Sequence, residues 1–172
     1  PWGATTQDVT DTGLVLVLKD VYDLIDTELA ELVERCLDLA VRYRDAVMPG
    51  RTHGQHALPI TFGYKVAVWA AELHRHRQRL AESRPRVLVG QFGGAVGTLA
   101  ATAEHGFAIR TRLMQELGLG EADITWHVAR DGLAEFANLL GLIAATVNKI
   151  VLEIINLQHS DGEAALKRGD VD

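Results

Sequence analysis

The sequence of 172 residues has few of the residues that cross-link a chain or interrupt its helices. It contains one cysteine, Cys36, and four prolines, while 48% of its residues are hydrophobic. A single cysteine excludes an intrachain disulfide framework and a thiolate metal cluster, and it suits a reducing compartment. We therefore expect a folded, mostly helical protein in the cytoplasm, with Cys36 in its core.

An excess of positive charge is also lacking, because the net charge is −6. No dense stripe of Lys and Arg offsets it, so we expect no nucleic-acid partner. The most basic run, residues 74–79, is predicted to be a solvated helix end. The longest apolar stretch, residues 139–157, is interrupted by Asn148, Lys149 and Glu153, so we expect neither a membrane span nor, at the start of the chain, a signal peptide.

Apolar residues recur at spacings of three and four along most of the chain, which predicts an all-α fold built as a long-helix bundle. The first helix is expected over residues 8–44, and its inward positions are Leu14, Leu18, Val21, Ile25, Leu29, Leu32, Cys36 and Leu39. The second is expected over residues 60–83 and ends at Pro85, with Val66, Trp69, Leu73 and Leu80 facing inward. A shorter helix over residues 103–117 ends at Gly118.

The last predicted helix, residues 129–159, is apolar on more than one face. Such a helix outside a membrane is buried on all sides, which in so short a chain indicates burial between subunits. The apolar positions are Leu133, Phe136, Leu139, Leu140, Leu142, Ile143, Val147, Ile150, Val151, Ile154 and Ile155.

Four polar or glycine-rich clusters lie between or beside these helices. Residues 3–8 include Thr5, Thr6, Gln7 and Asp8, and they are either a helix N-cap or a cradle for a carboxylate. Residues 91–98 end the stretch 87–98, whose four glycines among apolar residues predict a buried, closely approached backbone segment. In the fourth cluster, residues 126–131, Arg130 either binds an anion or forms a surface pair with Asp131.

The most informative cluster is the turn over residues 49–65, which contains Arg51, Thr52, His53, Gln55, His56 and Lys65. An ordinary connection between helices does not need that density of donors and titrating groups. His53 and His56 suit a proton donor, a buried structural imidazole or a metal pair, but no third metal ligand follows at a convincing spacing. We expect a site that holds a polyanion and moves a proton, without a metal.

Taken together, the four clusters resemble the signatures of the fumarase/aspartase superfamily. Residues 3–8 resemble its Gly-x-Thr-Ser/Thr-x-Asp turn, and Gly50-Arg51-Thr52-His53-Gly54-Gln55-His56-Ala57 resembles its second signature. The glycine segment followed by Trp126-His127 and Arg130-Asp131 is similar to its carboxymuconate cycloisomerase branch. Residues 1–172 would then be most of a central helical-bundle domain that is truncated at both ends, without the N-terminal domain, the signature serine loop and the C-terminal domain.

The resemblance implies a lyase that performs reversible β-elimination on a succinyl-type substrate without a cofactor. His53 would be the catalytic acid, while Thr5, Thr6, Gln7, Asp8, Arg51, Thr52, Gln55, Lys65 and Arg130 would bind the dicarboxylate. The superfamily builds its sites from three subunits of a homotetramer, and ten helical turns, about 54 Å, separate the first two clusters here. The general base would lie outside this chain.

Two branches of the superfamily and one function of another class stay open. A histidine at position 53 favours the adenylosuccinate lyases, which cleave a C–N bond, whereas Trp126-His127 favours the cycloisomerases, which close a lactone. Ala129 stands where related sequences often have Gln before Arg-Asp, so one substrate contact differs. A non-catalytic helical scaffold or oligomerisation domain is the further alternative.

Overall fold

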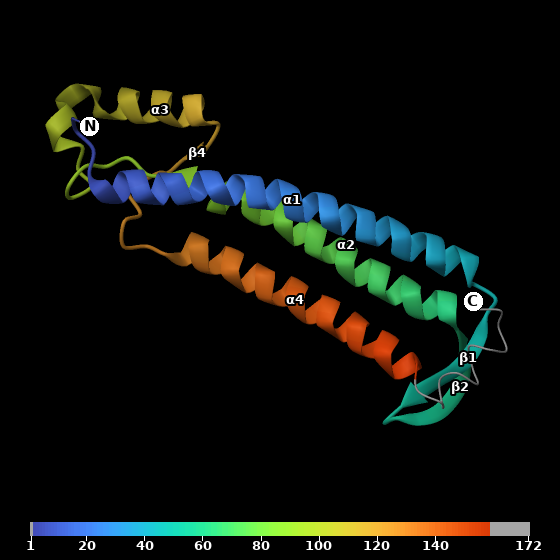
Figure 1. Ribbon diagram of the computed structural model, residues 1–172. Helices are drawn as coiled ribbons and strands as arrows, with labels where there is room; N and C mark the ends of the chain where they lie inside the picture. Colours follow the sequence, from blue (N-terminus) through green and yellow to red (C-terminus); the bar gives the residue numbers. More distant parts are fainter. Residues whose placement is uncertain (1, 159–172) are drawn as a thin grey trace. The chain divides into compact units, whose positions relative to one another are not determined.

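The computed structural model describes residues 2–158 and consists mainly of long helices (Figure 1). The helices are α1 (Thr6–Arg42), α2 (Phe62–Val87), α3 (Gly106–Leu117) and α4 (Asp131–Leu157), with a 3-10 helix over Ala100–His105. Two small two-stranded sheets join β1 (Val47–Thr52) with β2 (Gln55–Thr61), and β3 (Val89–Gly90) with β4 (Gly120–Glu121). The predicted helical bundle is confirmed, and the predicted end of its last helix at His159 lies outside the described residues.

The chain divides into two compact units, each made of two stretches of sequence. The first comprises Pro1–Asp26 and Arg79–Leu139, and the second comprises Thr27–Gln78 and Leu140–Asp172. Helices α1, α2 and α4 each contribute residues to both units.

The buried positions of α1 recur every seven residues. They include Val15, Tyr22, Leu29 and Cys36, and Asp8 and Tyr43 extend the same series at its two ends. The sequence predicted a different stripe, of which only Leu29 and Cys36 are buried, whereas Leu14 and Leu39 are about 40% exposed. The reason is that α1 carries apolar residues on several faces, and a period of 3.5 residues per turn keeps only one of them against its neighbours.

In the first unit, aromatic and glycine contacts fix the interior. The Tyr22 ring stacks on Phe136 at 4.8 Å between ring centres, and its hydroxyl is hydrogen-bonded to Ser83 Oγ at 2.8 Å. Of the glycine segment, which was predicted to be buried, Gln91 to Gly94 are buried, whereas Ala95, Val96 and Thr98 are exposed. A Cβ on Gly97 would lie 2.4 Å from Thr125 Cγ2, so the segment approaches its neighbour too closely for a side chain there.

Helix α2 buries all four residues that the sequence predicted to face inward, Val66, Trp69, Leu73 and Leu80. Two other expectations for α2 are wrong. The helix continues to Val87, past Pro85, because the residues after proline keep their own N–H donors, and Leu88 N–H bonds to Arg84 O at 2.9 Å.

The basic run at residues 74–79 therefore lies inside α2, not at its end. Its His76 is 4% exposed and is hydrogen-bonded to Thr146 Oγ1 on α4 at 2.8 Å. A polar partner within the second unit is what allows this histidine to be buried.

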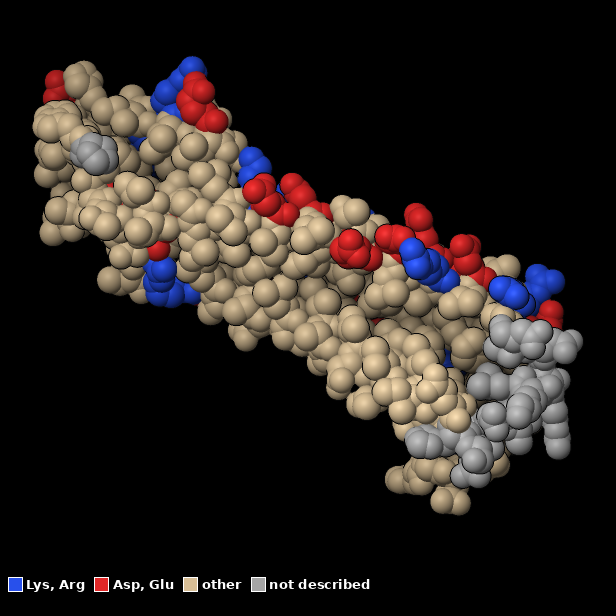
Figure 2. Space-filling view, in the orientation of Figure 1, with Lys and Arg blue, Asp and Glu red and all other residues tan. Residues whose placement is uncertain are grey.

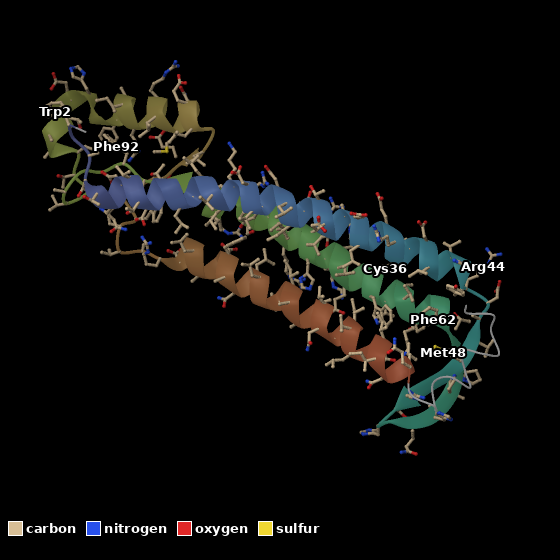
Figure 3. The ribbon with its side chains drawn as sticks, in the orientation of Figure 1. Trp2, Cys36, Arg44, Met48, Phe62 and Phe92 are labelled. Carbon is tan, nitrogen blue, oxygen red and sulfur yellow. The ribbon has the colours of Figure 1, made fainter. Side chains whose placement is uncertain are left out.

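The polar turn over residues 49–65 is a β-hairpin instead of a simple connection between helices. Strands β1 and β2 pair antiparallel, with Thr52 opposite Gln55 and His53-Gly54 as the two-residue loop. Both loop residues have positive φ, +50° at His53 and +74° at Gly54, as the mirror-image hairpin turns require. Phe62 lies at the base of the hairpin (Figure 3). Its ring makes edge contacts with Tyr43 and Trp69.

Helix α4 buries one stripe and leaves its other apolar positions exposed. Phe136, Leu139, Ile150 and Leu157 are buried, but seven large apolar residues are between 36% and 51% exposed: Leu140, Leu142, Val147, Val151, Leu152, Ile154 and Ile155. Figure 2 shows a largely uncharged surface over α4, with charged residues gathered along α1. By length and mean hydropathy α4 also meets the criterion for a membrane-crossing helix, which core helices of soluble proteins meet as well.

Candidate functional site

The turn that begins α1 carries the first predicted cluster. Thr5 is half-buried, Thr6 and Gln7 are exposed, and Asp8 is 2% exposed. The Thr5 N–H donates to Asp8 Oδ2 at 2.9 Å. In a capping box, an acidic side chain of the first turn accepts the backbone N–H before the helix in the same way. The Asp8 carboxylate thus satisfies a backbone N–H at the helix start, and the exposed Thr6 and Gln7 lie beside amides that a helix start leaves without intrahelical acceptors.

Asp8 is the centre of the first unit's polar network. Besides Thr5, its carboxylate accepts the amides of Gly93 at 3.0 Å and Gly94 at 2.9 Å, and it is 2.7 Å from His127 Nε2. Burial alone would raise the pKa of Asp8, but the hydrogen bonds from Thr5, Gly94, His127 and Gly93 outweigh it and lower the pKa. The carboxylate is thus ionised and shared between three segments of the chain.

A second layer of hydrogen bonds holds His127. Its Nδ1 lies 3.2 Å from Thr125 Oγ1, which in turn accepts from the Gln91 side-chain amide. The Gln91 oxygen accepts the Trp126 N–H at 2.8 Å. Gln91, Thr125 and His127 were not among the predicted site residues, although a glutamine inside a buried glycine segment is itself a sign of a polar network.

Arg130 forms a bidentate pair with Asp11 on α1, so the predicted surface pair with Asp131 is replaced by a pair with another carboxylate. Its Nη1 and Nη2 donate to the two Asp11 oxygens at 2.8 and 2.9 Å. Burial acts to raise the pKa of Asp11, but the hydrogen bonds from Arg130 and Gln7 and the charge of Arg130 together outweigh it and lower the pKa. The Arg130 side chain stays 42% exposed, so its remaining donors are open to an anion.

The second predicted cluster lies on the hairpin of the second unit. Thr52, His53, Gln55 and His56 are exposed, and Arg51 is half-buried. The structural interpretation of His53 and His56 as buried imidazoles is therefore wrong, because the two short strands cover neither ring. His53 is the first residue of the loop and is presented to solvent.

Lys65, in the first turn of α2, forms an ion pair with Glu153 of α4. Both side chains are mostly buried, at 19% and 28% exposure. The positive charge predicted to act on the substrate is therefore balanced within the second unit.

The structure thus collects three of the four clusters in the first unit and leaves the hairpin cluster in the second. Among the described residues, no group of three or more His, Cys, Asp or Glu side chains is arranged to hold a metal ion. The first unit offers hydroxyls, helix-start amides and a guanidinium for anionic groups, and the second offers an exposed imidazole for proton transfer.

Comparison with known proteins gives the class of protein that this fold and site define. The family described as "Lyase" matches residues 2–167. N-acetyl-S-(2-succino)cysteine lyase of Enterococcus italicus is 43% identical over 93% of this chain and 35% of its own length. Adenylosuccinate lyase of Pyrococcus abyssi is 43% identical over 92% of this chain and 36% of its own length.

Among solved structures, the 3-carboxy-cis,cis-muconate lactonizing enzyme of Pseudomonas putida superposes with a TM-score of 0.91. It is 44% identical and covers 94% of this chain and 36% of its own. The chain belongs to the fumarase/aspartase superfamily of lyases, as the motifs predicted. It spans little more than a third of the length of these relatives.

Proposed function

We propose that the protein containing this chain is a lyase that performs reversible β-elimination on a succinyl-type substrate, cleaving a C–N bond to release fumarate as adenylosuccinate lyases do. The observation that carries the proposal is the placement of His53. A non-glycine residue with φ of +50° on an exposed hairpin loop is held in a sparsely populated conformation. The two-residue loop requires this conformation, and it places the exposed imidazole of His53 at the tip of the hairpin, where it can give a proton to a bound substrate.

The difficult step is the removal of a proton from the carbon beside a carboxylate, which gives a dianionic aci-carboxylate. It needs a base, preorganised donors around that carboxylate and an acid at the leaving group. Thr5, Thr6 and the helix-start amides hold one carboxylate, and Arg130 binds a second anionic group through its free donors. Gln7 lines the same turn, and Asp8 contributes through the turn that it fixes, since its oxygens already have four donors.

The hairpin supplies the acid. His53 protonates the departing nitrogen, while Arg51, Thr52 and Gln55 orient the substrate around it. Lys65, balanced by Glu153, holds the first turn of α2 below the hairpin and adds little net charge. The base belongs to the serine loop that the superfamily carries beyond the residues present here.

The two groups of residues meet, in this proposal, between subunits of a homotetramer. The exposed apolar residues of α4 support it, because a contiguous apolar surface of this kind is typical of an interface. The substrate is a small dicarboxylate, and the reaction needs no cofactor.

A second candidate is lactone formation in the manner of the carboxymuconate cycloisomerases. It is favoured by His127, whose bond to Asp8 places the Trp126-His127 segment beside the carboxylate-binding turn. A non-catalytic scaffold is the third candidate, in which these turns serve only as helix caps.

The test uses the full-length protein with three substrates, adenylosuccinate, 3-carboxymuconate and N-acetyl-S-(2-succino)cysteine, each followed by absorbance. We expect adenylosuccinate turnover that falls by a factor of roughly 10² to 10⁴ in His53→Ala, the usual contribution of a general acid. His56→Ala, at a second exposed histidine of the hairpin, is the matched control and should keep wild-type activity.

Each other outcome has its own meaning. Turnover of the muconate substrate alone selects the cycloisomerase function. Turnover of the succinocysteine substrate alone keeps β-elimination but replaces nitrogen as the leaving atom. If none of the three reacts, and fumarate does not raise the melting temperature, the scaffold function replaces the lyase.

A further inference from the structure

The carboxylate of Asp8 has no oxygen left for a ligand, although it lies directly behind the turn proposed to bind one. Oδ2 accepts the amides of Thr5 and Gly94, each at 2.9 Å. Oδ1 accepts the amide of Gly93 at 3.0 Å and is 2.7 Å from His127 Nε2. Two donors on each oxygen satisfy the carboxylate, so its work is to join the segments that donate to it.

Three of these four donors are backbone amides, and His127 contributes the side-chain donor. Because Asp8 is ionised and can only accept, the Nε2 atom of His127 must carry the proton. The other ring nitrogen faces the hydroxyl of Thr125 at 3.2 Å, which fixes the ring plane. Thr125 thus orients the His127 ring through one nitrogen, and the other nitrogen is bonded to Asp8. This is the arrangement expected of a residue that holds another side chain in place.

The charged groups next to this network are already paired. Asp11, one turn further along α1, is bound by Arg130, and the Arg130 guanidinium lies 5.4 Å above the Trp126 ring. The position of Asp8 therefore depends on its own four donors. Loss of the imidazole would remove one of the two donors to Oδ1, in a site where Asp8 is 2% exposed and water cannot easily replace it.

We propose that His127 is a positioning residue for the carboxylate-binding turn: through Asp8 it locks the Thr5–Thr6 turn against the Gly93–Gly94 backbone, so that the turn is preorganised before a dicarboxylate arrives. This inference rests on the proposed function for the identity of the ligand. Its structural half, the locking of the turn, stands on the hydrogen bonds alone.

Two substitutions of His127 separate the bond to Asp8 from the bond to Thr125. In His127→Gln the side-chain amide extends to about the place of Nε2 and can still donate to Asp8. In His127→Asn the amide ends near the place of Nδ1 and reaches only Thr125. His105→Asn, at an exposed histidine of the same unit, is the matched control.

The experiment uses the full-length protein and fumarate as the probe. Calorimetry gives the fumarate Kd, steady-state kinetics gives KM and kcat with the substrate that the protein turns over, and hydrogen exchange is followed in peptides covering residues 2–9 and 90–98. We expect His127→Asn to weaken fumarate binding and raise KM about tenfold, the size of one lost hydrogen bond to a charged group, with a smaller change in kcat. Exchange in both peptides should accelerate, while His127→Gln and His105→Asn stay near wild type.

The proposal is overturned if His127→Asn leaves exchange in both peptides unchanged, or if it lowers kcat with KM and the fumarate Kd unaltered. Equal losses in His127→Gln and His127→Asn also contradict it, because the bond to Asp8 would then not matter. If wild type does not bind fumarate, the proposed function fails on its own. The exchange pattern of the two variants then still decides whether His127 locks the turn.

Discussion

At the scale of single residues, the molecule uses buried charge sparingly and surrounds it with donors. Asp8 and Asp11 are both nearly inaccessible, at 2% and 3% exposure, and each has strong partners within the first unit. A buried carboxylate without such donors would take up a proton instead of staying ionised. The ionised state of these two side chains is therefore a property of the segments around them.

This arrangement predicts an acid-sensitive first unit. The folded-state pKa of Asp8 lies below its ordinary value of 3.8, so its contribution to stability is complete above that value and is lost as the pH falls through the folded-state pKa. Asp8→Asn should cost about 1–3 kcal/mol at pH 7, because the amide places a donor among donors. The free energy of unfolding in urea, measured from pH 7 down to pH 3, should fall less steeply in Asp8→Asn than in wild type.

An exposed carboxylate of the same helix serves as the control for this measurement. Asp38→Asn should keep the wild-type free energy of unfolding at pH 7, because its side chain is exposed. Parallel curves for wild type and Asp8→Asn would show that the Asp8 network does not contribute to stability.

Two glycines of the first unit predict opposite responses to the same substitution. At Gly97 φ is +80° and a Cβ would meet Thr125 Cγ2 at 2.4 Å, whereas at Gly13, inside α1, nothing lies within 4 Å. Gly97→Ala should therefore cost about 2–4 kcal/mol through backbone strain and overpacking. Gly13→Ala should add up to about 1 kcal/mol through helix propensity. Thermal unfolding of the two variants, compared with wild type, checks both signs.

At the scale of elements, the long helices follow from the sequence and the hairpin does not. The spacing of apolar residues predicted α2 with all four of its inward side chains. It missed the β1–β2 pair because Pro49, Gly50 and Pro59 indicate a break in helix without indicating pairing. The His53-Gly54 loop was the available sign, since a residue that tolerates positive φ followed by glycine favours a two-residue hairpin turn.

The hairpin allows stability and activity to be separated at one position. Asparagine accepts positive φ readily, whereas a β-branched residue does not, so His53→Asn should leave the melting temperature unchanged or slightly raised. His53→Val should lower stability by about 1–2 kcal/mol. Both variants should lose activity on the substrate of the full-length protein. An active His53→Asn would remove the imidazole from the proposed mechanism.

The site was predicted less completely than the helices, for a reason that lies in long-range contacts. The turn at residues 3–8 and Arg130 were predicted as site residues from local pattern and resemblance. Their partners Gly93, Gly94 and Asp11 were not, because a bond such as Asp8 to His127 joins residues 119 positions apart. Such pairs depend on how the segments fold together, so the spacing of residues along the chain cannot predict them.

At the scale of the whole molecule, the exposed apolar residues of α4 predict assembly. Val151 and Ile155, four residues apart on one face, are each 46% exposed. The double substitution Val151→Lys with Ile155→Lys should dissociate the proposed homotetramer by placing two charges per chain in the interface. Light scattering after size-exclusion chromatography of the full-length protein should show a smaller species with reduced activity.

Phe107 on α3 is a suitable control, because it is apolar and 68% exposed but lies on another helix. Phe107→Lys should keep the wild-type mass. A wild-type protein that is monomeric at micromolar concentration would contradict the shared-site mechanism directly.

The division into two units has a consequence for how the chain can be taken apart. Each unit is assembled from two separate stretches of sequence, and α1, α2 and α4 each pass through both. No single cut, whether by a protease or by gene truncation, can therefore release one unit intact. Removing one unit and keeping the other therefore requires changes at two or more separate places in the sequence.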